Sequence, residues 1–109
     1  MERIYNKLVR DNIPSIIKSK GETPIIRELS EEVYKKELEK KLYEEYKEVI
    51  SATNDDRVEE LADMLEVIKA LANLEGKDLN DIVSIAEQKS EKRGAFDKKI
   101  FLEKVIEKQ

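Results

Sequence analysis

Apolar residues recur at intervals of three and four along residues 31–93, with charged residues between them. This spacing is typical of amphipathic α-helices, whereas a half-buried strand would alternate apolar and polar positions. It predicts three long helices, at about residues 31–53, 55–75 and 79–93, arranged around one core. The sequence therefore predicts an all-α domain.

The ends of these helices carry residues that commonly begin and stop a helix. Ser30 precedes a run of glutamates and is predicted to cap the first helix, and Asp78 is predicted to cap the third. Either Asn54 or Asp55 should cap the middle helix. Gly76 should end that helix, because glycine readily adopts the left-handed conformation that follows many helix C-termini.

The two ends of the chain are less regular. An extended segment is predicted around Ile4–Val9, and Asp11 is predicted to cap a short helix that carries three isoleucines and ends at Gly21. Residues 22–29 contain a proline and should form an extended link or a short strand. Residues 95–109 fit two interpretations, a strand with a short helix or one frayed helix.

Size and charge narrow the class of protein. The 109 residues are enough for one small domain, and a lone small helical chain buries little surface, so we expect a helical partner chain. The net charge of −4 argues against a nucleic-acid polymer as partner, because such proteins present a basic face. No apolar run approaches the roughly 20 residues that span a bilayer, and the N-terminus lacks the apolar stretch of a signal peptide. We therefore expect no membrane partner and a cytoplasmic location.

Two absent residue types exclude much chemistry. The chain has no Cys, which excludes disulfides, thiolate nucleophiles and Cys-ligated zinc. It has no His, which excludes imidazole bases, Ser-His-Asp triads and His-ligated metals. Any catalysis must use carboxylates, Lys, Arg, Tyr or a metal that prefers oxygen ligands.

Several acidic residues fall on the predicted inner face of the first long helix. Because a helix turns about 100° per residue, Glu45 lies within the apolar arc that contains Leu42 and Val49. Glu48 lies at the edge of this arc, and Glu44 lies further round. An unpaired charge on a buried face is costly, so Glu45 needs a compensating partner.

The next helix repeats this arrangement. Glu60 lies within its apolar arc and Asp63 at the margin, whereas Glu59 and Glu66 face the polar side. The short link between the helices predicts antiparallel neighbours, which can bring two acidic pairs of i, i+3 spacing together. Their repulsion favours a divalent ion with oxygen ligands, Mg²⁺ or Mn²⁺. Alternatively, these acids pair with Lys or Arg or lie at the rim of the bundle.

The acidic residues also resemble a family motif. "EEYKE" (residues 44–48) followed by "ELAD" (residues 60–63) is similar to the E-E-x-x-E … E-x-x-D pattern of the MazG-like all-α nucleotide pyrophosphohydrolases. "YNKLVRDNIP" near the N-terminus and "KRGAFDKKIFLE" near the C-terminus resemble the flanks of one short subgroup. That subgroup is often labelled phosphoribosyl-ATP pyrophosphohydrolase-like or house-cleaning NTP pyrophosphatase. The resemblance covers nearly the whole chain.

This resemblance implies an activity and a ligand set. Such enzymes hydrolyse a nucleoside triphosphate to a monophosphate and pyrophosphate, need Mg²⁺, and assemble as helical-bundle dimers or larger oligomers. The motif assigns the metal ligands to Glu45, Glu48, Glu60 and Asp63. Glu44 occupies the first position of the motif. It lies on a side of the helix that suits a residue orienting a water molecule better than a direct metal ligand. Either Glu44 or Glu45 can serve as the catalytic base.

Basic residues are predicted to hold the substrate phosphates. Lys89 and Arg93 fall on the inner side of the third long helix, although they also fit a role at the helix C-terminal dipole or over the core rim. Lys7 and Arg10 form a second phosphate-binding candidate pair, with a surface ion pair as the alternative. Asn6 is a candidate contact for the base or ribose.

Other functions fit the same residues. Phosphoribosyl-ATP pyrophosphohydrolase of histidine biosynthesis shares the fold and the acidic motif. A non-catalytic helical dimerisation module with solvated acids is the alternative outside the enzymes. Tyr43 and Tyr46 are expected to pack in the core or an interface and not to stack on a base.

Overall fold

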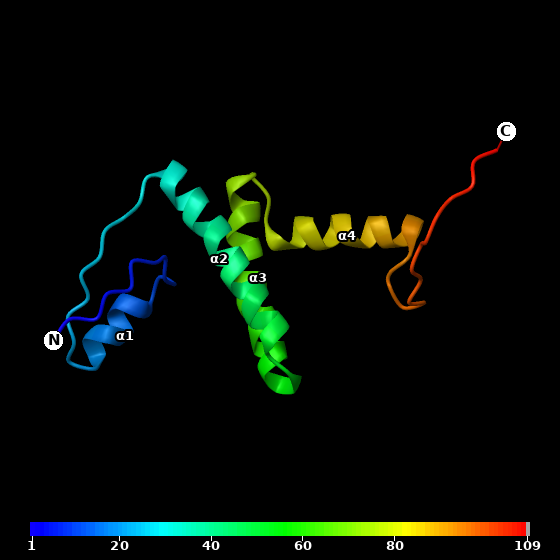
Figure 1. The fold of residues 1–109 in the computed structure, drawn as a ribbon. Coiled ribbons are helices and arrows are strands. Elements are labelled where there is room, and N and C mark those ends of the chain that lie inside the picture. The colour runs from blue at the N-terminus through cyan, green and yellow to red at the C-terminus, as the bar shows by residue number, and fades with distance from the viewer. Residues whose placement is uncertain (109) are drawn as a thin grey trace.

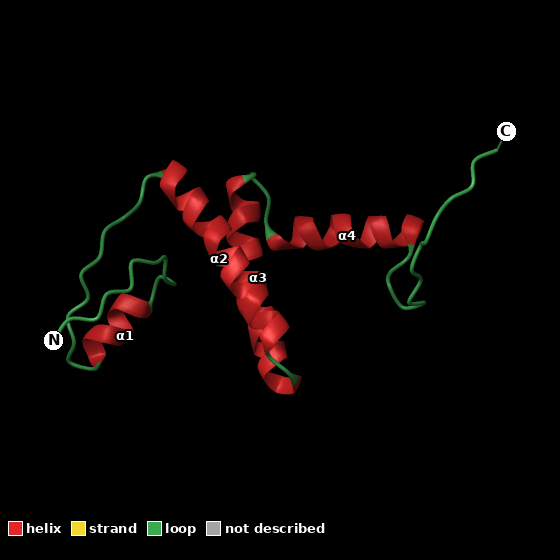
Figure 2. Ribbon diagram, in the orientation of Figure 1, coloured by secondary structure: helices red, strands yellow, loops and turns green. Residues whose placement is uncertain are grey.

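The computed structural model describes residues 1–108 and is built from four helices connected by irregular segments (Figures 1 and 2). The helices are α1 (Ile13–Ser19), α2 (Glu31–Ser51), α3 (Asn54–Leu74) and α4 (Leu79–Arg93). No strand occurs in this part of the chain, which confirms the all-α prediction. The strand considered for residues 22–29 is therefore wrong, and residues 95–108 form neither of the two predicted structures.

The two longest helices form an antiparallel hairpin. Figure 1 shows α2 and α3 lying side by side and joined by a short turn, as their sequence spacing predicted. The most buried apolar side chains of the described residues are Leu38 on α2 and Val67 and Ala72 on α3. The core of the chain therefore lies within this hairpin.

The turn of the hairpin is fastened by Arg57. Its Nε donates to the carbonyl oxygens of Val49 and Ala52, both at 3.1 Å, and its Nη2 donates to Ile50 O at 3.4 Å. These carbonyls belong to the end of α2, which has no intrahelical donors for them. Asn54 is already the first residue of α3, because the chain reverses within two residues after Ser51. The N-cap of α3 is therefore Thr53 and not Asn54 or Asp55, and the Thr53 side chain makes no capping hydrogen bond.

The other helix ends show where local sequence decides a structure. Ser30 accepts from the amide of Val33 at 3.3 Å, and Asp78 forms a reciprocal capping box with Asp81, so both predicted caps are confirmed. The predicted Asp11 cap is wrong. Asn12 occupies the N-cap of α1 without a side-chain bond, and Pro14 in the first turn lacks the N–H that a cap would bind.

Helix α4 leaves the hairpin, so the predicted single core of three long helices is wrong. Within residues 1–108 α4 contacts α3 but makes no contact with α2, and every side chain from Val83 to Lys108 is exposed. The radius of gyration is 19.2 Å, against about 13 Å for a compact domain of this length. The extents of 69 × 33 × 25 Å describe an elongated molecule with the C-terminal segment at one end (Figure 1). The apolar stripe of α4 shows that one face needs cover, but this chain does not provide it.

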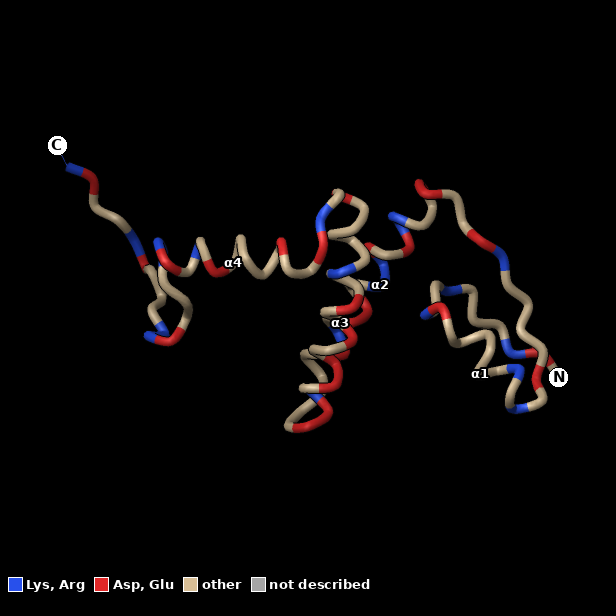
Figure 3. Tube along the Cα trace, turned by 180° about the vertical axis from the view of Figure 1, so that it is seen from behind, with Lys and Arg blue, Asp and Glu red and all other residues tan. Residues whose placement is uncertain are grey.

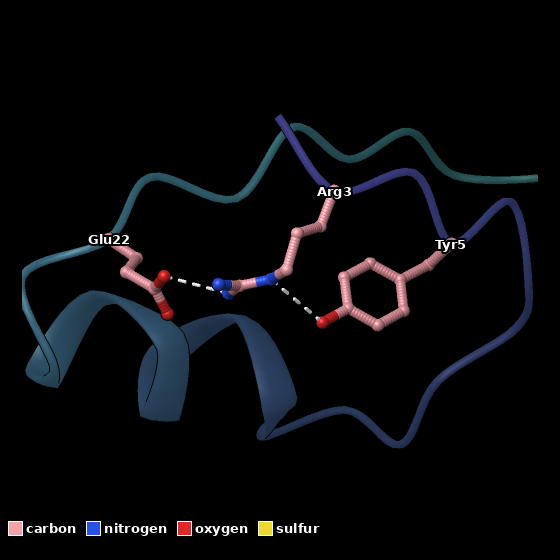
Figure 4. A network of polar contacts seen from close by, with 3 residues as sticks. All are labelled: Arg3, Tyr5 and Glu22. Atoms are coloured by element: carbon pink, nitrogen blue, oxygen red, sulfur yellow. Dashed lines mark hydrogen bonds and ion pairs between the residues drawn. The ribbon is translucent and has the colours of Figure 1, made fainter. Parts of the chain in front are cut away.

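The N-terminal segment is tied to the residues that follow α1. Figure 4 shows Arg3 between Glu22 and Tyr5. The guanidinium donates to Glu22 Oε2 at 2.7 Å and to the Tyr5 hydroxyl at 3.3 Å. The hydrogen bond to Glu22 is the main cause of the raised pKa of Arg3. Residues 1–22 therefore form a local unit beside the hairpin.

None of the helices within residues 1–108 is both long enough and apolar enough to cross a membrane.

Candidate metal centre

Three carboxylates from the two hairpin helices converge at one point. Glu45 on α2 and Glu60 and Asp63 on α3 each offer an oxygen atom, and these oxygens lie within 4.8 Å of one another. All three side chains are of intermediate burial. We call this group the acidic cluster.

The position of the acidic cluster follows from the helical spacing. Glu60 and Asp63 are one turn apart on α3, and Asp63 lies one turn before the buried Val67. Glu45 follows the buried Leu38 by two turns on α2. The residues that close the hairpin core therefore also bring the three carboxylates to its margin.

The other two acids of the motif lie outside the cluster. Glu48 and Glu44 are exposed on α2, and neither belongs to the group of converging oxygens. Glu44 lines a shallow hollow of about 520 Å³ on the outer side of α2, together with Tyr43 and charged residues. Three of the four predicted metal ligands thus come together in this chain, and Glu48 lies one turn from Glu45.

The cluster changes the acidity of one member. The pKa of Glu45 is raised, first because partial burial disfavours its charged form and then because Asp63, Glu60 and Glu48 repel that charge. Lys41, one turn before Glu45, opposes the shift. The sequence reasoning did not include Lys41, although its i, i+4 spacing from Glu45 is the usual signal for such a pair.

Arg10 reaches the cluster from the N-terminal segment. Its Nη2 donates to Asp63 Oδ1 at 2.8 Å, and both side chains are about half exposed. This is the surface ion pair that the sequence left open as an alternative to phosphate binding. Lys7 lies over the ring of Tyr5 at 5.8 Å, and Asn6 is exposed with a left-handed φ of 45°.

The remaining predicted phosphate ligands lie elsewhere in this chain. Lys89 and Arg93 are exposed in the last two turns of α4. Figure 1 shows that α4 runs away from the hairpin that carries the acidic cluster. The structure of one chain therefore does not bring these two residues to the three carboxylates.

The acidic cluster fits an ion that prefers oxygen ligands. In an octahedral Mg²⁺ site with bonds of about 2.1 Å, ligand oxygens lie about 3 to 4.2 Å apart. The oxygens of the cluster lie within 4.8 Å, so small side-chain rotations suffice to bring them to this spacing. Such an ion would replace Arg10 as the positive charge next to Asp63. Glu45, Glu60 and Asp63 would hold it, with Glu48 near enough along α2 to approach.

Comparisons with known proteins add little to this description. A segment of 50 residues is 46% identical to a protein of Mycolicibacterium smegmatis described as an uncharacterized protein. The segment makes up 46% of this chain and 51% of that protein, so the chain matches about half the length of this relative. The sequence matches no protein-family model, and no solved structure matches the chain. The function must therefore be argued from the acidic cluster.

Proposed function

We propose that this protein is a Mg²⁺-dependent nucleotide pyrophosphohydrolase of the MazG-like kind, which hydrolyses a (deoxy)nucleoside triphosphate to a monophosphate and pyrophosphate. The observation that carries the proposal is the convergence of Glu45, Glu60 and Asp63 within 4.8 Å. A helical wheel and a motif resemblance both single out these same residues. Mn²⁺ is an alternative ion, because it accepts the same oxygen ligands.

A divalent ion at this cluster would polarise the phosphoryl oxygens and offset the charge of the departing pyrophosphate. The remaining steps of the hydrolysis use a water molecule and carboxylates of the chain. A water attacks the α-phosphorus, its proton passes to a carboxylate, and the bond to the oxygen that bridges to the β-phosphorus breaks. Because the chain has no His, a carboxylate must accept this proton, and Glu45 is one candidate. Glu44 is the alternative acceptor.

Basic side chains would position the triphosphate. When a divalent ion binds Asp63, the guanidinium of Arg10 is released next to the place where phosphates would lie. Lys7, Lys89 and Arg93 are the other candidates, and Asn6 would contact the nucleoside. We assign the protein to the cytoplasm and to a dimer or tetramer, in keeping with its elongated and incompletely buried chain.

A nucleotide panel assayed for pyrophosphate release, with and without Mg²⁺, tests this function. Glu45→Gln and Asp63→Asn should abolish release while helicity is retained, because each removes a charged metal ligand. Glu59→Gln and Glu66→Gln are matched controls on the polar side of α3 and should be nearly silent. Loss of activity in all four variants would refute the assignment of metal ligands from the side of the helix on which each acid lies.

The same panel separates the alternatives. Release from phosphoribosyl-ATP alone would indicate the histidine-biosynthetic enzyme. No release from any nucleotide with Mg²⁺ would favour a non-catalytic dimerisation module.

A further inference from the structure

The start of the chain forms a unit that is held together from within. Arg3 ties the first residues to Glu22, just after α1, through an ion pair of 2.7 Å. On the other side of α1, the amide of Ile13 donates to Arg10 O at 3.0 Å. The side chain of Arg10 therefore extends from a backbone that is hydrogen-bonded to α1. We call residues 1–22 the N-terminal unit.

One ion pair joins the N-terminal unit to the hairpin. Among the hydrogen bonds and ion pairs within residues 1–108, the bond from Arg10 Nη2 to Asp63 Oδ1 is the only one that links residues 1–29 to α2 or α3. Helix α1 contacts neither of these helices and has no buried residue, and the link that follows the unit is mostly exposed. The position of the unit on the hairpin therefore depends on Arg10.

The charges of the two parts favour this contact. The N-terminal unit contains five basic and three acidic residues, whereas residues 31–74 of the hairpin contain seven basic and thirteen acidic residues. Figure 3 shows acidic residues along α2 and α3 and basic residues in the N-terminal unit at their side. Within the described chain, Arg10 is the only Lys or Arg that forms an ion pair with the acidic cluster. It stands where a metal ion would otherwise supply positive charge.

The contact is weak enough for a metal ion to displace. The side chains of Arg10 and Asp63 are 56% and 46% exposed, and an exposed ion pair favours the docked arrangement by up to about fivefold. A divalent ion carries twice the charge and would bind Asp63 together with Glu45 and Glu60. Two cations that compete for one carboxylate weaken each other's binding by the same factor. The ion must therefore weaken the docking of Arg10 as much as Arg10 weakens the binding of the ion.

We propose that the N-terminal unit is a strap that a divalent metal ion releases. Without metal, Arg10 holds the unit on Asp63, and an ion bound at the acidic cluster takes Asp63 and frees the whole unit. The inference rests on the proposed function for the ion, and it goes further because it predicts a movement of residues 1–22 and not only of one side chain. In the metal-free chain the contact is autoinhibitory, since the guanidinium holds an oxygen that the ion needs.

Distances between two spin labels test this release without an enzyme assay. The chain has no cysteine, so Ser15→Cys on α1 and Asn73→Cys on α3 introduce two unique labelling sites at exposed positions. Pulsed dipolar spectroscopy then measures the distances between the labels. An excess of unlabelled wild-type chain keeps labelled copies apart in any oligomer. Mg²⁺ is added at constant ionic strength, because salt alone weakens an exposed ion pair.

The metal-free labelled chain should show a narrow component from docked units and a broad component from released units. Mg²⁺ should lower the ratio of docked to released units by up to about fivefold, to the value of metal-free Arg10→Gln. Arg10→Gln itself should not respond to Mg²⁺, because its unit is already released. Lys18→Gln is the matched control. It removes another exposed positive charge from the same unit and should behave like the wild type.

The possible failures can be told apart. Unchanged distances in a wild type that binds Mg²⁺ by calorimetry would overturn the strap and leave the proposed function intact. Equal distances in metal-free wild type and Arg10→Gln would show that Arg10 does not hold the unit, which also overturns the strap. A protein that binds no Mg²⁺ and releases no pyrophosphate from any nucleotide would refute the proposed function and with it the release by metal.

Discussion

Replacing Glu45 with glutamine should stabilise the metal-free protein and weaken its response to Mg²⁺. The oxygens of Glu45, Glu60 and Asp63 lie within 4.8 Å. At that distance two like charges repel by about 0.9 kcal/mol at the dielectric constant of water, which suits side chains that are only partly buried. The amide removes two of the three repulsions, so we expect a gain of about 1–2 kcal/mol in the free energy of unfolding, or about 5–15 °C in Tm.

The dependence on pH follows from the direction of the shift. The pKa of Glu45 is raised in the folded chain. A group with a raised folded pKa contributes stability that is fully present below its unfolded pKa and is lost as the pH rises through its folded pKa. The advantage of Glu45→Gln should therefore grow from the unfolded pKa of about 4.3 up to the folded pKa and then stay constant.

Mg²⁺ should reverse the order of stability. An ion that binds only the folded chain stabilises it by about 2.7 kcal/mol at one hundred times its Kd. The wild-type gain should be clear at about pH 7.5 and shrink toward about pH 4.5, where protons compete for the carboxylates. In Glu45→Gln this gain should be weak.

Thermal melts over pH and Mg²⁺ concentration measure both effects, with the protein concentration held constant because self-association also raises Tm. Glu59→Gln is the matched control, since it removes an exposed charge from the polar side of α3. The reasoning is refuted if metal-free Glu45→Gln melts at or below the wild type and Mg²⁺ stabilises it as much as it stabilises the wild type.

Three further predictions concern the basic residues and one helix cap. Lys89→Ala and Arg93→Ala should raise KM for the nucleotide or lower kcat with little change in Mg²⁺ affinity. Unchanged steady-state constants would instead favour the alternative that these residues complement the C-terminal dipole of α4 or cover the rim of the core. Arg10→Gln should tighten Mg²⁺ binding by up to about fivefold, the limit expected for an exposed ion pair, because Arg10 competes with the ion for Asp63; titration calorimetry would contradict this if the affinity fell. Asp78→Ala should cost about 1 kcal/mol of stability, measured by urea unfolding, because it removes the capping box of α4.

Features decided by neighbouring residues could be predicted from the sequence. Ser30 and Asp78 cap their helices through residues three positions away, so the local pattern is sufficient. The facing of Glu45, Glu60 and Asp63 follows from helical periodicity, and the short turn makes their two helices neighbours. The predicted Asp11 cap was wrong for an equally local reason, because Asn12 takes the N-cap and Pro14 in the first turn has no N–H for a cap to bind.

Features that depend on distant contacts could not be predicted. An apolar stripe on α4 shows that one face needs cover but does not say which surface provides it, and so α4 was placed in a core that it leaves. The bond from Arg10 to Asp63 joins residues 53 positions apart, and no spacing rule links them. The sequence named both residues as candidates but could not show that they meet.

The two hairpin helices limit where relatives of this chain can differ in length. The acidic residues reach the cluster because their spacing from the buried Leu38 on α2 and the buried Val67 on α3 is helical. One residue inserted within either helix between an acid and its buried neighbour would rotate that acid by about 100° relative to the core. Insertions and deletions that preserve the cluster should therefore fall outside these helices, for example between Gly76 and Asp78 or after Gly94.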